Sequence, residues 1–411
     1  MSINHHHLRH RHHRHSAAIL IILSVLGIQG CTDAAPYKPW HTEKLSEEFT
    51  ASMAGQQVRN FKDYIELEQR LFRELDEKIY TDTPGGHEQM LERYSHGSRS
   101  DPGQWQNNWN RSFELPVENP VGGVLLLHGM SDSPYSLRTI GLSLQQKGHH
   151  VIGLRLPGHG TAPSGLRFIN WRDMAAAVRL AMADLSSRLG KKPLHIIGYS
   201  TGAALALDYA LNSLENENLS LPASLVMISP AIRVHPVSGL ARFKNSLSIL
   251  PGLEGLAYLS VMDEFDPYKY NSFATNAAAQ VHAITRNVDR RIRALASSAS
   301  TGKLPPILVL KSTVDSTVTT AAVVDNLLAR LPAARNELVL FDINRKAAIK
   351  STLLVSDPAP LTDRLLADNS LPFAVTFITN DPESDDLVAR YREAFSIEKK
   401  NTVNLNISWP R

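Results

Sequence analysis

The amino-acid sequence predicts an α/β fold, in which a mostly parallel central sheet is covered by helices on both faces. Two observations predict it. From about residue 112 onward, short apolar runs alternate with segments of helical periodicity, the pattern of strands joined by crossover helices. At the centre of this pattern, the apolar run Pro193–Ile197 leads through Gly198-Tyr199-Ser200-Thr201-Gly202 into the Ala- and Leu-rich segment Ala203–Leu214. A buried strand therefore turns sharply into a helix at this point.

The Gly198–Gly202 turn has the composition of a nucleophile elbow. The two glycines leave room where a Cβ would clash, so that Ser200 can occupy a strained turn with its Oγ exposed. The helix that begins after Ser200 directs backbone N–H groups at any developing oxyanion. A plain glycine-rich turn is the alternative interpretation. The strand before the turn and the helix after it favour the elbow, which makes Ser200 the candidate nucleophile.

Composition and charge bound the class of protein. The chain of 411 residues is 43% hydrophobic and 20% charged, which suits a globular protein of one large domain with an insertion or of two domains. The formal net charge is +3, but Arg9, Arg11 and Arg14 are the only Lys, Arg, Asp or Glu residues before Cys31. Without these three arginines, 40 basic residues face 40 acidic ones. Proteins that bind nucleic acid usually carry a basic footprint, so no nucleic-acid partner is expected.

Residues 1–31 have the anatomy of a signal peptide. A basic stretch with seven histidines precedes the apolar run Ala17–Ile28, which is too short to span a bilayer, and Ile28-Gln29-Gly30-Cys31 follows. This pattern resembles the bacterial lipoprotein signal, which implies that Cys31 becomes the lipidated first residue. The resemblance also implies a bacterial cell envelope location, and Thr32 after the cysteine favours the outer membrane. An ordinary cleaved signal or anchor with an incidental cysteine is the alternative.

Residues 32–111 are predicted to form a tether and an N-terminal helical extension without a core of its own. The stretch Thr32–Ser46 carries two prolines and little periodicity, which is typical of a tether. A helix is expected over Gln57–Tyr80, where apolar residues recur at three-, four- and seven-residue spacings. The following stretch, residues 84–109, is rich in turn residues.

Residues 112–411 are predicted to form the main domain. Its strands are expected at 112–117, 121–127, 151–156, 193–197, 223–229, 306–310, 337–341, 372–379 and from 401, and its helices at 136–147, 171–189, 203–214, 319–331 and 386–395. The alternation stops between residues 231 and 303, which predicts a helical cap inserted between two sheet strands. Tyr268, Tyr270 and Phe273 in this insertion could line a pocket, although plain packing is the commoner use of such aromatics.

Four motifs together resemble the α/β-hydrolase superfamily, and more narrowly its monoacylglycerol lipases and carboxylesterases with a helical cap. They are Leu127-His128-Gly129-Met130, Leu156-Pro-Gly-His159-Gly160-Thr161, the Gly198–Gly202 elbow, and Leu310-Lys-Ser-Thr-Val-Asp315. The resemblance implies that Ser200 is the nucleophile and that the backbone N–H groups of Met130 and Thr201 form the oxyanion hole. It also implies that Asp315 is the acid that orients a catalytic histidine, with Asp342 as the runner-up. By the same resemblance, His128 and His159 structure their loops.

The sequence departs from the family in one respect, because it contains no histidine after His282. The family places the histidine after the acid, and without it nothing takes the proton of Ser200. Three interpretations stand. The histidine could lie in a continuation of the chain beyond Trp409-Pro410, the protein could be an inactive member of the fold, or His128, His159 or His282 could serve as the base.

The sequence therefore predicts a lipid-anchored serine hydrolase that cleaves monoacylglycerol-like lipids or small acyl esters through an acyl-enzyme. The alternative is a catalytically inactive lipoprotein of the same fold that binds a lipid or a partner. Neither a metal nor an organic cofactor is expected, because no cluster of ligands occurs at suitable spacing. The partners expected are an acyl ester or lipid substrate and, through the anchor at Cys31, a membrane.

Overall fold

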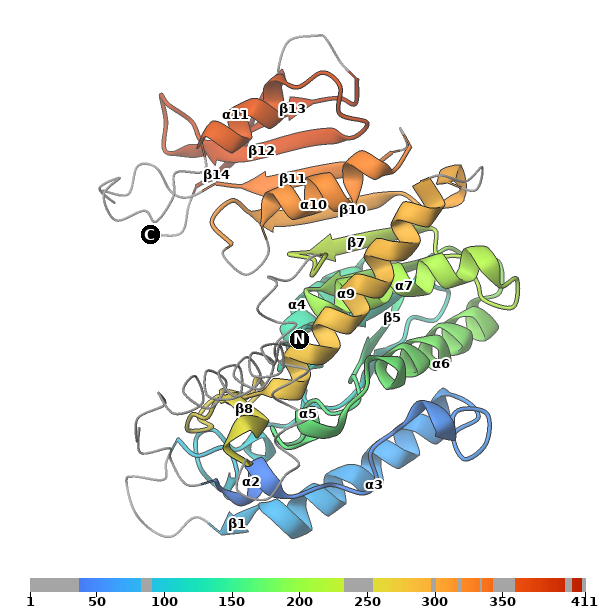
Figure 1. Cartoon of the computed structure of the whole chain (residues 1–411), viewed down its shortest axis with the longest axis vertical. Coiled ribbons are helices and arrows are strands. Elements are labelled where there is room, and N and C mark those ends of the chain that lie inside the picture. The colour runs from blue at the N-terminus through green and yellow to red at the C-terminus, as the bar shows by residue number, and fades with distance from the viewer. Residues whose placement is uncertain are drawn as a thin grey trace, which may run out of the picture. The chain divides into compact units, whose positions relative to one another are not determined.

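The structure is a computed structural model, and it describes residues 37–82, 91–232, 254–296, 301–315, 319–332, 335–342, 359–395 and 401–408 (Figure 1). The predicted leader with Cys31 and residues 233–253 of the predicted cap lie outside the described residues. The body that begins at Lys38 is described below by itself. Among the described residues, no helix is long and apolar enough to cross a membrane.

A ten-stranded sheet forms the centre of this body, in the order β14-β13-β12-β11-β10-β7-β6-β4-β5-β3. The strands are parallel from β5 to β12 and antiparallel at both edges. Their bounds are β3 Phe113–Leu115, β4 Gly122–Leu127, β5 His149–Leu154, β6 Leu194–Tyr199, β7 Ser224–Ile228, β10 Ile307–Ser312, β11 Glu337–Phe341, β12 Ala374–Asn380, β13 Asp386–Arg392 and β14 Asn401–Ser408. The predicted mostly parallel sheet is confirmed. Every residue of β4 is buried, as expected for a central parallel strand.

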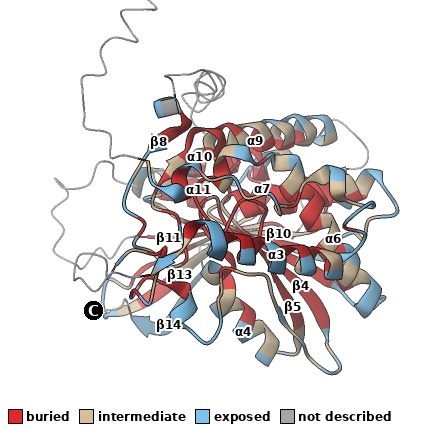
Figure 2. Ribbon diagram, turned by 90° about the horizontal axis from the view of Figure 1, so that it is seen from below, coloured by how far each residue is buried: buried red, intermediate tan, exposed pale blue. Residues whose placement is uncertain are grey.

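Helices cover both faces of the sheet, as predicted. In Figure 2, α4 (Arg138–Gln146) lies on one face, and α6 (Trp171–Leu189), α7 (Thr201–Glu215) and α9 (Thr275–Ala296) lie on the other. The shorter helices are α5 (Gly165–Phe168), α10 (Thr320–Asn326) and α11 (Ala359–Ala367), with a 3₁₀ turn at Pro134–Leu137 before α4. Helix α6 begins and ends where the sequence predicts. Its first turn forms a capping box, in which the Asn170 side chain accepts from the backbone N–H of Asp173 and the Asp173 carboxylate accepts from the backbone N–H of Asn170.

The N-terminal extension packs on the main body and shares a core with it. Helix α2 (Pro39–Thr42) follows Lys38, and helix α3 (Phe61–Ile79) presents buried residues toward the body, where it contacts α6 (Figure 1). Trp40, which is 8% exposed, clusters with Phe72 and Tyr94 of the extension and with Ala162 of the main domain. The stretch from Lys38 to Ser46 is therefore not a free tether. Trp40 is buried, and the backbone N–H groups of Ser46 and Glu47 donate hydrogen bonds to the Glu74 carboxylate.

One predicted element is wrong. Residues 386–395 were expected to form a helix, but Asp386–Arg392 is strand β13, paired antiparallel with both β12 and β14. Val388 and Leu387 are buried in this sheet, so the gain from pairing and burial outweighs the local helical pattern. Two small sheets complete the body, β1 (Thr81–Asp82) with β2 (Ser95–His96), and β8 (Tyr258–Ser260) with β9 (Phe273–Ala274).

The described part of the predicted cap lies between β7 and β10 in the chain, at the expected point of insertion. Its largest element is α9, which packs along α7 and also contacts α5 and α6 (Figure 1). Ile284, Val288 and Ile292 form the buried stripe of this helix. This helix extends the layer that covers the sheet. The division of the chain into a cap and a main domain remains a prediction for residues 233–253.

Candidate active site

Backbone strain gathers where the central parallel strands end. Ser200, directly after β6, has φ 52° and ψ −112°, and Ser131 and Ser229, after β4 and β7, also have positive φ. Such conformations are unfavourable for residues with a side chain and persist only where the surroundings hold them. The N–H of Ser200 donates to the Ile228 carbonyl at 2.9 Å, and the N–H of Ala231 donates to the Ser200 carbonyl at 3.1 Å. The carboxyl edge of the sheet is therefore the strained edge, with Ser200 at its centre.

The two glycines of the elbow are required by space. A Cβ at Gly202 would lie 2.1 Å from the Leu127 carbonyl oxygen, and one at Gly198 would lie 2.5 Å from the backbone of Ala203. The start of helix α7 is therefore in direct contact with the C-terminal end of β4, as the motif predicts. Ser200 itself is half-buried.

The loop after β4 lies against the elbow. Leu127 is paired with Gly198 in the sheet, and a Cβ on Gly129 would lie 3.0 Å from the Tyr199 ring. Met130 follows Gly129 and is half-buried, while Thr201 opens α7 and is 1% exposed. The structure thus brings together the loop that carries Met130, the start of α7 at Thr201, and Ser200.

His128 and His159 are occupied by loop contacts. The N–H of Leu156 donates to His128 Nε2 at 3.0 Å, which makes Nδ1 the protonated nitrogen that donates to the Gly129 carbonyl at 2.8 Å. His159 Nδ1 lies 2.9 Å from the Pro157 carbonyl oxygen, and its Nε2 lies 3.3 Å from the Met130 Sδ. Both rings are fully buried, and burial lowers the pKa of His159 to about 4 and holds the pKa of His128 well below its ordinary value. These contacts fit the predicted structural role. In His128 both ring nitrogens are hydrogen-bonded, whereas the Nε2 of His159 lies against the Met130 sulfur.

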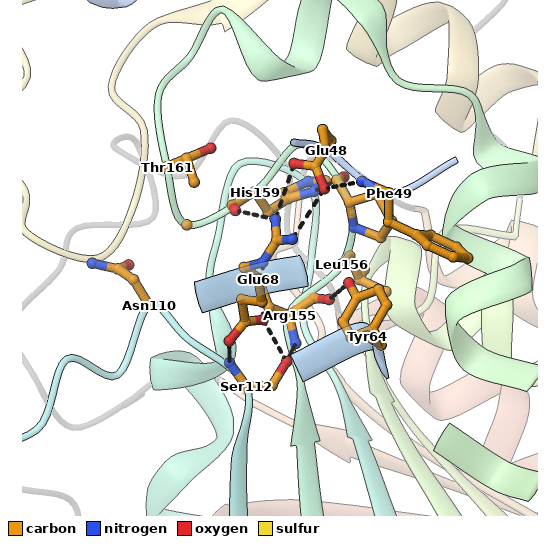
Figure 3. A network of polar contacts seen from close by, with 12 residues as sticks. Glu48, Phe49, Tyr64, Glu68, Asn110, Ser112, Arg155, Leu156, His159 and Thr161 are labelled. Carbon is orange, nitrogen blue, oxygen red and sulfur yellow. Dashed lines mark hydrogen bonds and ion pairs between the residues drawn. The ribbon is translucent and has the colours of Figure 1, made fainter. Parts of the chain in front are cut away.

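A buried ionic network holds the loop that carries His159 (Figure 3). Arg155, 1% exposed, donates to Glu48 from both terminal nitrogens at 3.0 and 3.1 Å and to Glu68 from Nε at 3.0 Å. It also donates to the His159 carbonyl at 3.0 Å, and the N–H of Gly158 donates to Glu48 at 2.8 Å. Because Glu48 and Glu68 come from the N-terminal extension, that extension fixes a loop that contacts Met130.

Tyr270 braces the same loop from the inserted segment. Its hydroxyl accepts from the N–H of Thr161 at 2.8 Å and donates to the Gly158 carbonyl at 3.2 Å, while its own N–H donates to the Ser131 carbonyl at 2.9 Å. Tyr270 is 2% exposed, so it serves packing and loop geometry. Tyr268 stacks on Tyr135 with 3.7 Å between the ring centroids.

The two carboxylates predicted for the acid role, Asp315 and Asp342, follow strands β10 and β11. Asp315 follows β10, and its Oδ2 accepts from Lys311 Nζ at 2.7 Å. The Lys311 side chain has no exposed surface, and burial lowers its pKa although Asp315 opposes the shift. Asp342, the runner-up, follows β11 and accepts from the Thr379 hydroxyl at 2.7 Å. Because β10, β7 and β6 run parallel, Asp315 follows a strand at the same carboxyl edge of the sheet as the elbow.

Sequence reasoning missed Arg155, Glu48, Glu68, Lys311 and Asp132. Arg155 follows directly on an apolar run, a signal that a charge is buried, but its acidic partners lie 107 and 87 residues away. Asp132 lies two residues beyond Met130 and is 8% exposed, and burial raises its pKa to about 6. Within the described ranges, no group of three or more His, Cys, Asp or Glu residues could hold a metal ion.

Comparisons with known proteins agree with this geometry. The family model described as “Alpha/beta hydrolase family” matches residues 124–395. The thermostable monoacylglycerol lipase of Bacillus sp. (strain H-257) is 29% identical over 147 residues, 34% of this chain and 58% of that lipase. The magnesium-chelatase 30 kDa subunit of Rhodobacter capsulatus is 37% identical over 101 residues, 24% of this chain and 32% of that subunit. A solved structure from work on the metagenome-derived lipolytic enzymes LipS and LipT is 21% identical, with a TM-score of 0.45, 56% of this chain and 87% of that chain covered.

Proposed function

The chain belongs to the alpha/beta hydrolase family, and from this premise we propose that it is a serine hydrolase that cleaves carboxylic esters through an acyl-enzyme. The observation that carries the proposal is Ser200 at φ 52° between β6 and α7, at the strained carboxyl edge of the sheet. A serine held in this way presents its Oγ at the mouth of the site.

In the proposed mechanism, the Ser200 Oγ attacks the ester carbonyl carbon while a general base takes its proton. The backbone N–H groups of Met130 and Thr201 stabilise the oxyanion, and the leaving alcohol takes a proton as the tetrahedral intermediate collapses. Water then hydrolyses the acyl-enzyme and frees the acid product and Ser200. Asp315 orients the base. The base itself is not assigned to a residue. No histidine follows His282, both ring nitrogens of His128 are hydrogen-bonded, and burial lowers the pKa of His159 to about 4.

We propose a monoacylglycerol-like lipid or a small acyl ester as the substrate. The name of the Bacillus relative supports the first choice, although the aligned region spans 58% of that lipase. We further propose that Cys31 carries a lipid anchor that holds the protein in a bacterial cell envelope, at the outer membrane rather than the inner one. Incorporation of labelled palmitate that is lost in Cys31→Ala tests the anchor.

A fluorophosphonate probe tests the nucleophile, with the chain from Thr32 onward, which contains every described residue, beside its Ser200→Ala variant. Labelling that disappears in Ser200→Ala is the expected result, and an ester panel then defines the acyl preference. A folded wild-type chain that neither labels nor hydrolyses any ester contradicts the proposal for this chain. Labelling that persists in Ser200→Ala would move the nucleophile elsewhere.

A second candidate function is an inactive member of the fold that binds a lipid or a partner at the cell envelope. It is favoured by one specific observation, the engagement of His128 and His159 in loop contacts, in a sequence with no histidine after His282. The same labelling experiment separates the two candidates. An inert Ser200 in a folded chain that still binds acyl lipid favours this second one.

A further inference from the structure

A cationic groove lies between the start of α6 and the outer face of α9. It has a volume of about 720 Å³, and its charged lining consists of Arg172, Arg286, Arg290, Arg293 and Asp289. Trp171 forms an aromatic wall, with the Arg172 guanidinium 4.8 Å from its ring centroid. The four arginines are exposed, so their guanidinium groups face solvent in the groove.

The positive charge of this groove is only partly compensated. Among the described residues, Arg172 and Arg286 form no ion pair with a carboxylate, and Arg290 donates only to the neutral Asn287. Asp289 accepts from Arg293 and also from Arg330 at 3.0 Å. The single carboxylate in the lining is therefore shared between two arginines, and a net positive charge remains.

This arrangement is unfavourable for the helix that carries it. Arg286 and Arg290 are four residues apart on α9, and Arg290 and Arg293 are three apart, so like charges are neighbours on one face. Such pairs of like charges destabilise a helix. The opposite face of α9 is apolar and buried, so packing of that face holds the helix in place. After the leader the chain has 40 basic and 40 acidic residues, so this local excess is not a consequence of an overall basic composition.

We propose that this groove binds the phosphate-bearing headgroup of an anionic membrane lipid. Arginine forks match phosphate oxygens in pairs, and tryptophan is favoured at the level of lipid headgroups. The volume is that of a small-ligand site and not of a track along a strand. A nucleic acid would instead require a basic footprint over the whole domain, which the charge balance lacks.

The choice of a membrane lipid as the source of the phosphate rests in part on the proposed anchor at Cys31. Lys38, where the described body begins, is seven residues after Cys31, so the connecting chain reaches at most about 25 Å. A body on so short a connection stays close to the headgroups. A cationic groove would then fix which side of the body faces the membrane.

Vesicle flotation of the chain from Thr32 onward tests the proposal without the anchor. Wild type, Arg286→Gln/Arg290→Gln and a control, Arg73→Gln/Arg99→Gln, are compared on phosphatidylcholine vesicles with and without phosphatidylglycerol. The control removes the same charge from exposed arginines outside the groove. We expect binding only to the anionic vesicles, weakened about 30-fold in the groove variant and unchanged in the control, since each basic side chain near the surface contributes about 1 kcal/mol.

Further conditions separate binding in the groove from attraction to the rest of the protein surface. Binding is expected to disappear at about 1 M salt, where the Debye length falls to about 3 Å. Arg286→Lys/Arg290→Lys keeps the charge but loses the paired N–H geometry, so its binding is expected to lie between that of wild type and that of the glutamine variant. Ser200→Ala should bind vesicles as wild type does, so a failed hydrolase proposal leaves this result standing. Equal binding of the groove variant and wild type, or a preference for inorganic phosphate or single-stranded RNA over anionic vesicles, would overturn the proposal.

Discussion

The two halves of the site edge are held in different ways. On the side of β5, β4 and β6, the loop after β5 is fixed by a buried network that reaches from Glu48 and Glu68 through Arg155 to His159 (Figure 3). The ring of His159 contacts Met130 in the loop after β4. On the side of β10 and β11, Asp315 accepts from Lys311 of β10, the strand that it follows. Asp342, which follows β11, accepts from Thr379 of the neighbouring strand β12. The nucleophile half thus depends on a distant segment of the chain, whereas the acid half depends on close neighbours in the sheet.

The two halves can therefore be perturbed separately. The loop after β5 is held by the Arg155 network, and the elbow by close backbone packing. At the other half, Asp315 accepts from Lys311. The first half can be tested by stability and labelling of Ser200, and the second by substitutions at Lys311 and Asp315.

The largest effect is expected from Arg155→Met. The substitution keeps an apolar stem but leaves two carboxylates without their shared cation, and Glu68 is only 3% exposed. Removing one partner of such a buried set costs about 3–5 kcal/mol of unfolding free energy. Urea unfolding measures the loss, and fluorophosphonate labelling of Ser200 should fall with it if the brace holds the oxyanion loop.

Arg188→Met provides the matched control. Arg188 pairs with Glu114 and Asp184, but its side chain is 41% exposed, so solvent screens both pairs. The loss there should stay below about 1 kcal/mol. Equal losses in the two variants would contradict a special role for the buried network and weaken the contrast between the halves.

Gly202→Ala should produce the next largest effect. The new methyl group would meet the carbonyl oxygens of Leu127 and His128 at 2.1 and 2.6 Å, so α7 must move away from β4. Overpacking of this kind costs up to about 3 kcal/mol and would displace the Thr201 N–H from the oxyanion position. Labelling of Ser200 measures the displacement, and Gly255→Ala, where a Cβ meets nothing within 4 Å, is the control. Full labelling in Gly202→Ala would show that the elbow tolerates a wider spacing.

A third test uses pH. Burial lowers the pKa of His159 to about 4 from an ordinary value near 6.5. The neutral ring is favoured in the folded state, so its contribution to stability is fully present above about pH 6.5 and is lost as the pH falls through about 4. Between pH 7 and pH 5, wild type should lose about 2 kcal/mol more than His159→Gln. Urea unfolding of both proteins at several pH values measures this difference. If the unfolding free energies of wild type and His159→Gln fall equally between pH 7 and pH 5, then His159 is not buried in neutral form.

The sequence predicts the local structure around Ser200 well because its signals are local. The Gly198–Gly202 turn, the bounds of α6 and the buried strand before His128 all follow from spacing within a few residues. The Arg155 brace is missed because its partners are distant in sequence, and no local pattern pairs Arg155 with Glu48. Strand β13 is missed for a related reason, since the partners that make it a strand, β12 and β14, are outside its own window. The buried ion pair between Lys311 and Asp315 could not be predicted either, because lysine side chains usually lie at the surface.

The smallest effect is expected from Lys311→Met. The variant removes a buried cation, but Asp315 is 16% exposed and can be solvated, so the cost should be about 1 kcal/mol, well below that of Arg155→Met. The double variant Lys311→Met/Asp315→Asn should recover that loss, because it leaves no unpaired charge. If Lys311 only positions Asp315, Ser200 labelling is the same in Lys311→Met as in wild type. If labelling is lost while stability is kept, then Lys311 takes part in activating Ser200, and the two halves of the site are joined by a lysine where the family uses a histidine.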